Sequence, residues 1–152
     1  MCWLSPSAVE SPLTKQQLRF MQFLTSPHIC YCMSPVAESI LDVEGVTPRI
    51  VADLGQVDFT IRHVRDDVAD HYSEADLEEA YRLIMANQIS GSQFRQIVDQ
   101  AQYTAQSLFF DDLIVLLFPS ERHQAVFASF DYREDFPIFQ IIEQATDSTS
   151  AT

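Results

Sequence analysis

The sequence has little lysine and little glycine, and each shortage excludes a class of protein. Its 152 residues include 22 acidic and 9 basic ones, of which eight are Arg and one is Lys, and the formal net charge is -13. Such a charge excludes binding through nucleic-acid phosphates or anionic lipid, because both need clustered Lys and Arg. The three glycines, Gly45, Gly55 and Gly91, lie far apart, which excludes a phosphate-binding glycine loop.

Long apolar runs are also lacking. No stretch approaches the roughly 20 uncharged residues that span a bilayer, and the first 30 residues lack the basic start and apolar run of a secretory signal. We therefore expect a soluble, cytoplasmic protein with no membrane partner. With 47% apolar residues the chain is not disordered by composition, and its length fits one domain. No nucleophile elbow, Walker loop or HExxH motif is present, so the sequence favours a protein that is not an enzyme.

Composition changes at Met33. Residues 1–32 hold all three cysteines, the only Trp, the only Lys and one acidic residue, whereas 21 acidic and 7 basic residues follow. Either residues 1–32 are an extension, with a helix over Thr14 to Leu24, or translation starts at Met33; we favour the second interpretation. We expect residues 1–32 to be poorly structured, residues 33–145 to form a single α+β domain and residues 146–152 to be a disordered tail.

Three side chains of the kind that bind zinc, His28, Cys30 and Cys32, lie close together in the first part. A structural zinc site takes four ligands, and no second pair follows at a suitable distance, so we predict neither a metal site nor a cofactor. The acidic surplus and the lack of Lys favour a protein adapted to molar salt, where the Debye length of about 3 Å screens self-repulsion. An ordinary acidic protein is the alternative.

The hydrophobic pattern from Met33 predicts the order helix, two strands, two helices, three strands, helix. In the first hairpin we expect Phe59, Ile61 and His63 on one face. The fold class is then α+β, with a five-stranded, mainly antiparallel sheet and helices packed on it. The expected segments are a helix from Pro35 that ends before Gly45, strands Arg49–Leu54 and Val57–Val64, a helix opened by a capping box at Ser73–Asp76 and broken at Ser90-Gly91, a shorter helix with Phe94, strands Thr104–Phe110, Leu113–Phe118 and Ala125–Phe130, and a helix after Asp135.

The segment Val64-Arg65-Asp66-Asp67-Val68, followed by His71-Tyr72-Ser73 and a helix with Leu77 and Tyr81, resembles an uncharacterised family of small haloarchaeal proteins. The resemblance covers roughly residues 34–143 and implies a halophilic setting, but the family carries no assigned activity or site residues. Residues 120–124 depart from it, since they lack the glycine turn expected between the last strands. The layout is similar to roadblock and profilin-like domains, in which two hairpin blocks meet edge to edge.

A candidate surface site comprises Arg65, Asp66, Asp67 and Tyr72. Two carboxylates beside an Arg could hold a divalent cation or transfer protons. We favour a plainer interpretation, in which the acids complement a helix dipole and Arg65 pairs with one of them. A cluster of His63, Asp67 and His71 is a further, less favoured arrangement.

Three functions remain open at this point. The first is a non-enzymatic protein-interaction or regulatory module, which binds a protein partner or a second copy of itself. The second is a small-molecule sensing domain with a pocket between sheet and helices. The third is an enzyme that uses Arg65, Asp66 and Asp67. An apolar patch around Phe109, Phe110, Phe136 and Phe139 would favour the first.

Overall fold

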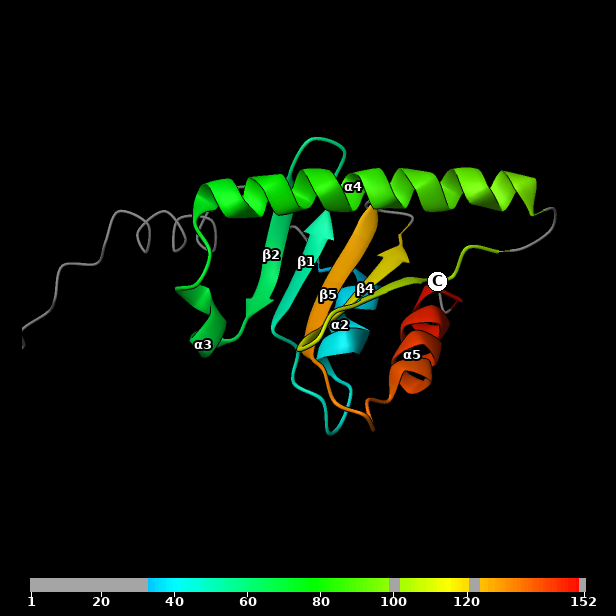
Figure 1. The fold of residues 1–152 in the computed structure, drawn as a ribbon. Helices are drawn as coiled ribbons and strands as arrows, with labels where there is room; N and C mark the ends of the chain where they lie inside the picture. The colour runs from blue at the N-terminus through cyan, green and yellow to red at the C-terminus, as the bar shows by residue number, and fades with distance from the viewer. Residues whose placement is uncertain (1–32, 99–101, 121–123, 151–152) are drawn as a thin grey trace, which may run out of the picture. The chain divides into compact units, whose positions relative to one another are not determined.

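The computed structural model describes residues 33–98, 102–120 and 124–150, and its fold is of the predicted α+β class. Five strands form one antiparallel sheet in the order β2-β1-β5-β4-β3 (Figure 1). The two hairpin blocks meet where β1 pairs with β5, with Ile50 opposite Ser129 and Leu54 opposite Ala125. The strands are β1 Ile50–Leu54, β2 Phe59–Val64, β3 Gln106–Phe109, β4 Leu113–Pro119 and β5 Ala125–Asp131.

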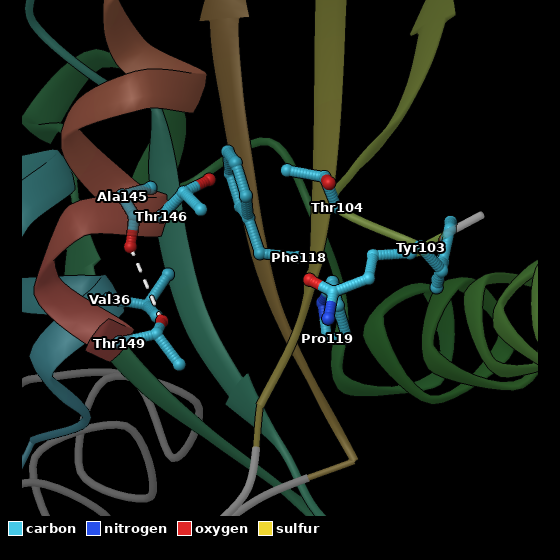
Figure 2. A pocket seen from close by; sticks show the side chains of 9 residues that line it. Val36, Tyr103, Thr104, Phe118, Pro119, Ala145, Thr146 and Thr149 are labelled. Carbon is cyan, nitrogen blue, oxygen red and sulfur yellow. Dashed lines mark hydrogen bonds between the residues drawn. The ribbon is translucent and has the colours of Figure 1, made fainter. Parts of the chain in front are cut away.

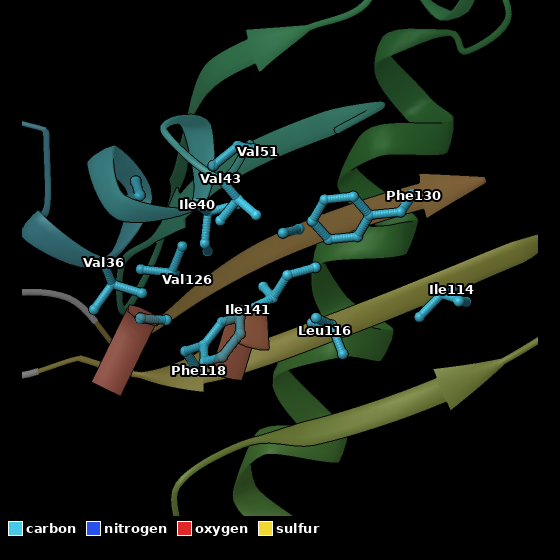
Figure 3. Close-up of a cluster of buried hydrophobic side chains, with 13 residues drawn as sticks. Val36, Ile40, Val43, Val51, Ile114, Leu116, Phe118, Val126, Phe130 and Ile141 are labelled. Carbon is cyan, nitrogen blue, oxygen red and sulfur yellow. The ribbon is translucent and has the colours of Figure 1, made fainter. Parts of the chain in front are cut away.

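Helices α2 (Pro35–Leu41) and α5 (Ile138–Ser150) cover one face of the sheet. Ser34 begins α2: its hydroxyl accepts a hydrogen bond from the Ala37 N–H, and Pro35 occupies the first turn, where no N–H is needed. Figure 3 shows the cluster that these helices bury against the sheet. Its buried members are Val36, Ala37 and Ile40 from α2, Val43 just after that helix, Ile141 and Ala145 from α5, and Val51, Ile114, Leu116, Phe118, Val126, Ala128 and Phe130 from the strands.

Helix α4 (Glu74–Ile97) covers the opposite face. It begins with the predicted capping box, since the Ser73 hydroxyl accepts from the Asp76 N–H while the Asp76 carboxylate accepts from the Ser73 N–H. Tyr81 then anchors it: its hydroxyl donates to the Gly55 carbonyl over 2.6 Å. The cluster on this face comprises Tyr81, Ile84 and Met85 from α4 against Ala52, Leu54, Phe59, Ile61, Leu108, Leu113, Val115, Leu117, Ala125 and Phe127.

Strand β4 has the burial that its six apolar residues predict. From Ile114 to Phe118 it is buried throughout, because α4 covers alternate residues and α2 and α5 cover the others. No helix of the described residues is long and apolar enough to cross a membrane.

The predicted helix break at Ser90-Gly91 is wrong, because α4 continues through it to Ile97. Glycine costs a helix only about 1 kcal/mol, and here it has a packing role. A Cβ at Gly91 would lie 3.0 Å from Cζ of Tyr103, so the missing side chain lets the tyrosine approach the helix. The second helix of the predicted pair is instead α3 (Asp66–Ala69), a single turn before α4.

Helix α5 also differs from its prediction. It runs to Ser150, so residues 146–150 of the expected disordered tail are helical. Ala145 is buried in the core and anchors this part of the helix, while the hydroxyls of Thr146 and Ser148 donate to carbonyls of the preceding turn.

The alternation predicted for β2 fails at a β-bulge. Ala52 and Val51 of β1 pair with Ile61 and His63, so Arg62 is the extra residue. Strict alternation predicts that His63 and Ile61 lie on the same face of the sheet. Because of the bulge, His63 instead lies on the face of Val51, opposite to that of Ile61. The predicted helix over Thr14 to Leu24 and the residues His28, Cys30 and Cys32 lie outside the described residues.

Candidate functional site

The Arg65 corner, defined as Arg49, Arg65, Asp67, Tyr72 and Asp131, joins the ends of three neighbouring strands. Arg49 directly precedes β1, Arg65 follows β2 and Asp131 ends β5, and these strands are adjacent in the sheet. Antiparallel pairing places these ends at the same side of the sheet, and the Arg65 N–H donates to the Arg49 carbonyl over 2.8 Å. The sheet therefore brings together two residues, Arg49 and Asp131, that the sequence did not link to the candidate site.

The Arg65 guanidinium is the centre of this corner. Its Nε and Nη2 donate to the two carboxylate oxygens of Asp67 at 2.5 and 2.8 Å, and its Nη1 donates to Asp131 at 2.6 Å. Asp131 also accepts from Arg49 Nη1 at 2.9 Å. The bidentate pair with Asp67 is the geometry that a planar guanidinium favours. The predicted pairing of Arg65 with a neighbouring acid is thus present, with Asp67. Arg65 also pairs with Asp131, which belongs to a different strand.

Charge in the corner is mutually compensated. Hydrogen bonds from Arg65 lower the pKa of both Asp67 and Asp131 and outweigh burial, which acts in the opposite direction. The same bonds raise the pKa of Arg65. Burial lowers the pKa of Arg49, but its hydrogen bonds to Asp131 and to the Tyr72 hydroxyl outweigh this and raise it. Both carboxylates are therefore anions at neutral pH, whereas a general acid or base is most effective with a pKa near the working pH.

The other sequence-selected residues have separate places. Asp66 is exposed in the first turn of α3, where its charge complements the helix dipole. The structure does not gather His63, Asp67 and His71 into a metal site: His63 Nε2 lies 3.2 Å from the Pro48 carbonyl oxygen. Among the described residues, no group of three His, Cys, Asp or Glu side chains is placed to hold a metal ion.

A second ion pair, Asp53–Arg62, is buried beneath the start of α2. Asp53 is 1% exposed and accepts from Arg62 Nε at 2.6 Å and from the Ser34 hydroxyl at 2.6 Å. Arg62 is the bulge residue of β2, so the bulge is what directs this side chain to Asp53. The group joins β1, β2 and α2 inside the fold and has a structural place.

The hollow expected for a sensing domain exists but is small. Figure 2 shows it between the helices and the loop before β3, with Val36 and Thr149 on one side and Tyr103 and Pro119 on the other. Its volume is about 160 Å³. Pockets that bury a drug-sized ligand have about 300–1,000 Å³, so the hollow disfavours the sensing alternative.

The most distinctive surface lies on α4 and β3. Between residues 83 and 110 the sequence contains only two charged residues, Arg95 and Asp99, in a chain that is 20% charged. Tyr103 links the two elements, because its hydroxyl hydrogen-bonds both Gln88 of α4 and Gln106 of β3. We call this the uncharged surface; its exposed large apolar side chains are Leu83, Ile89, Phe94, Ile97, Val98, Phe109 and Phe110.

The two edges of the sheet differ. Edge strand β2 carries a bulge and Arg62, both of which hinder pairing with another strand. Edge strand β3 has neither charge nor proline, and its described register with β4 is continuous. The Phe110 N–H donates to the Leu113 carbonyl, so by alternation the backbone groups of Ser107 and Phe109 point away from β4. The sequence could have revealed this surface through its long gap in charge.

The patch predicted from four phenylalanines is only partly present. Phe109, Phe110 and Phe139 are exposed, but Phe136 packs against Phe130 with ring centroids 5.0 Å apart.

Comparison with known proteins finds one similarity. The model of a domain of unknown function (DUF7522) matches residues 36–150, which include every strand and helix of the described fold except the first residue of α2, Pro35. No curated protein and no solved structure matches the chain.

Proposed function

We propose that this chain, which belongs to the DUF7522 family of domains of unknown function, is a non-enzymatic protein-interaction or regulatory module. Its binding face is the uncharged surface of α4 and β3. The observation that carries the proposal is that seven exposed large apolar side chains coincide with the segment that has almost no charge. Exposed apolar side chains that gather on one element, as they do on α4, are typical of protein-binding sites.

The Arg65 corner supports a non-enzymatic role. Its two arginines and two aspartates neutralise one another, and its carboxylates have lowered pKa values. Such a group fastens strand ends and is poorly suited to move protons.

The architecture gives limited further support. An antiparallel sheet with a long helix on one face and two helices on the other is similar to roadblock-like domains, in which homodimers through sheet or helix edges are common. This is a likeness of layout, and a fold alone does not carry a function.

We also propose that the module works inside the cell at high salt. From Met33 on, acidic residues outnumber basic ones three to one. At molar salt this surplus no longer strains the fold, because charges are screened over about 3 Å.

Co-purification from cells that express the gene tests the interaction role. The variants Phe94→Glu and Phe109→Glu place a charge on the uncharged surface, whereas Val57→Glu and Phe139→Glu change exposed apolar residues elsewhere and serve as matched controls. Proteins that bind the wild type and both controls should be lost from the first two variants, with melting temperatures unchanged. The proposal is wrong if the first two variants recover the same proteins as the controls.

A further inference from the structure

We propose that the partner of this face is a second copy of the chain, bound by antiparallel packing of two α4 helices centred on Ser90. The inference rests on the proposed function and names the partner.

A second apolar stripe runs along the outer side of α4. At about 100° per residue, Leu83, Ala86, Ser90, Phe94 and Ile97 fall within an arc of about 80°. All five are exposed. This arc lies about half a turn away from Tyr81, Ile84, Met85 and Gln88, which face the sheet. The outer stripe therefore has no role in the core, and Figure 1 shows α4 continuing beyond the sheet at its C-terminal end.

The spacing of the stripe is symmetric about Ser90. Its members follow one another at intervals of three, four, four and three residues. If two such helices run antiparallel with Ser90 facing Ser90 of the second copy, Leu83 faces Ile97 and Ala86 faces Phe94. A dimer with two-fold symmetry needs one self-complementary patch, and this stripe supplies it: each large ring meets a small side chain.

Charge also favours a second copy at this place. Two chains with a net charge of -13 repel each other, and α4 from Leu83 to Ile97 carries only Arg95. The acidic first turns, which contain Glu74, Asp76, Glu78 and Glu79, lie beyond the end of the other helix in the antiparallel arrangement. The contact thus avoids opposing carboxylates, which would disfavour a parallel pair.

The contact is short, about 21 Å of helix at 1.5 Å per residue. It falls in the smallest class of specific interfaces, below about 1,200 Å². We therefore expect a reversible dimer that tightens as KCl increases from 0.1 to 2 M, because salt screens the repulsion between copies.

Disulfide trapping tests the arrangement in the full chain with Cys2, Cys30 and Cys32 replaced by Ser. In this background Ser90→Cys should form a covalent dimer under mild oxidation in 2 M KCl. Ala86→Cys is the matched control: two copies of residue 86 are offset by about 12 Å along the helices, too far for a disulfide, which needs Cα atoms within about 7 Å. We expect at least tenfold less covalent dimer from the control.

Light scattering in 2 M KCl completes the test. The wild type and Val57→Glu should dimerise, and Phe94→Glu should raise the dissociation constant at least tenfold. The α4 arrangement would be overturned if the cysteines at positions 86 and 90 give equal amounts of covalent dimer. It would also be overturned if Phe109→Glu disrupts the dimer and Phe94→Glu does not. If the wild type is a strict monomer in 2 M KCl, the partner is not a second copy of the chain. The proposed interaction role would still stand in that case if Phe94→Glu loses other proteins in the co-purification experiment.

Discussion

The buried pair of Asp53 and Arg62 allows a quantitative test of how the fold is held together. Replacing Arg62 by Leu removes the guanidinium from a carboxylate that is 1% exposed. The Arg62 side chain is itself 11% exposed, so water cannot readily take its place. Removal of one partner from a buried ion pair costs about 3–5 kcal/mol, because the remaining carboxylate stays buried and charged with hydrogen bonds but without the opposite charge of Arg62.

Two further variants separate this cost from other effects. Ser34→Ala removes the hydroxyl that donates to Asp53 and caps α2, and should cost about 1–2 kcal/mol. Combining Asp53→Asn with Arg62→Leu removes the buried charge but keeps a polar partner for Ser34. This double variant should therefore recover about 2 kcal/mol of the loss caused by Arg62→Leu alone.

Urea denaturation at fixed KCl concentration measures these free energies of unfolding, with circular dichroism to confirm a folded baseline. The order of stability should be wild type, Ser34→Ala, double variant, Arg62→Leu. If Arg62→Leu costs no more than Ser34→Ala, or if the double variant is as unstable as Arg62→Leu, the buried pair does not hold the fold as argued.

Four other outcomes are expected from the same structure. Because the pKa of Asp131 is lowered in the folded state, chiefly by Arg65, its stabilising contribution is present above the unfolded pKa of about 3.9 and is lost as pH falls through the lower pKa of the folded state. The melting temperatures of wild type and Asp131→Asn should therefore differ modestly at pH 7 and converge as the pH is lowered below that folded pKa, and equal melting temperatures at every pH would refute the ion pairs. Tyr81→Phe should lose about 0.5–1.5 kcal/mol in urea denaturation, since it removes the hydrogen bond to Gly55, and an unchanged stability would contradict that bond. A chain that starts at Met33 should melt at the temperature of the full chain; a drop of several degrees would show that residues 1–32 stabilise the domain. The melting temperature should rise between 0.1 and 3 M KCl, and a constant value would refute adaptation to salt.

Much of the fold could be predicted because local pattern and tertiary structure agree. The apolar run of β4, the capping box at Ser73 and the proline of the first turn of α2 each act through neighbours in sequence. Such signals specify an element before its tertiary contacts are known.

The errors arose where a distant contact decides the local conformation. Gly91 lies within α4, and Tyr103 packs where a side chain at this position would be. Arg62 forms a bulge that brings it to Asp53, a residue of the neighbouring strand, and this turns His63 to the other face. Neither contact has a signature within its own segment.

The candidate site shows the same division. Arg65 and Asp67 are two residues apart, so their pairing could be predicted from sequence. Asp131 joins them only because β5 lies beside β1 in the sheet, and strand order is not visible in the pattern of any single strand.

The distribution of charge connects the salt proposal with the interaction proposal. In dilute buffer a formal net charge of -13 opposes the association of copies of this chain through their exposed apolar side chains. In molar salt that repulsion is screened, and exposed side chains such as Phe94 and Ile97 are free to associate. An exposed apolar stripe is therefore harder to keep uncovered in the proposed habitat than in ordinary cytoplasm. Its presence on the outer side of α4, which does not contribute to the core, is best explained by a partner that covers it.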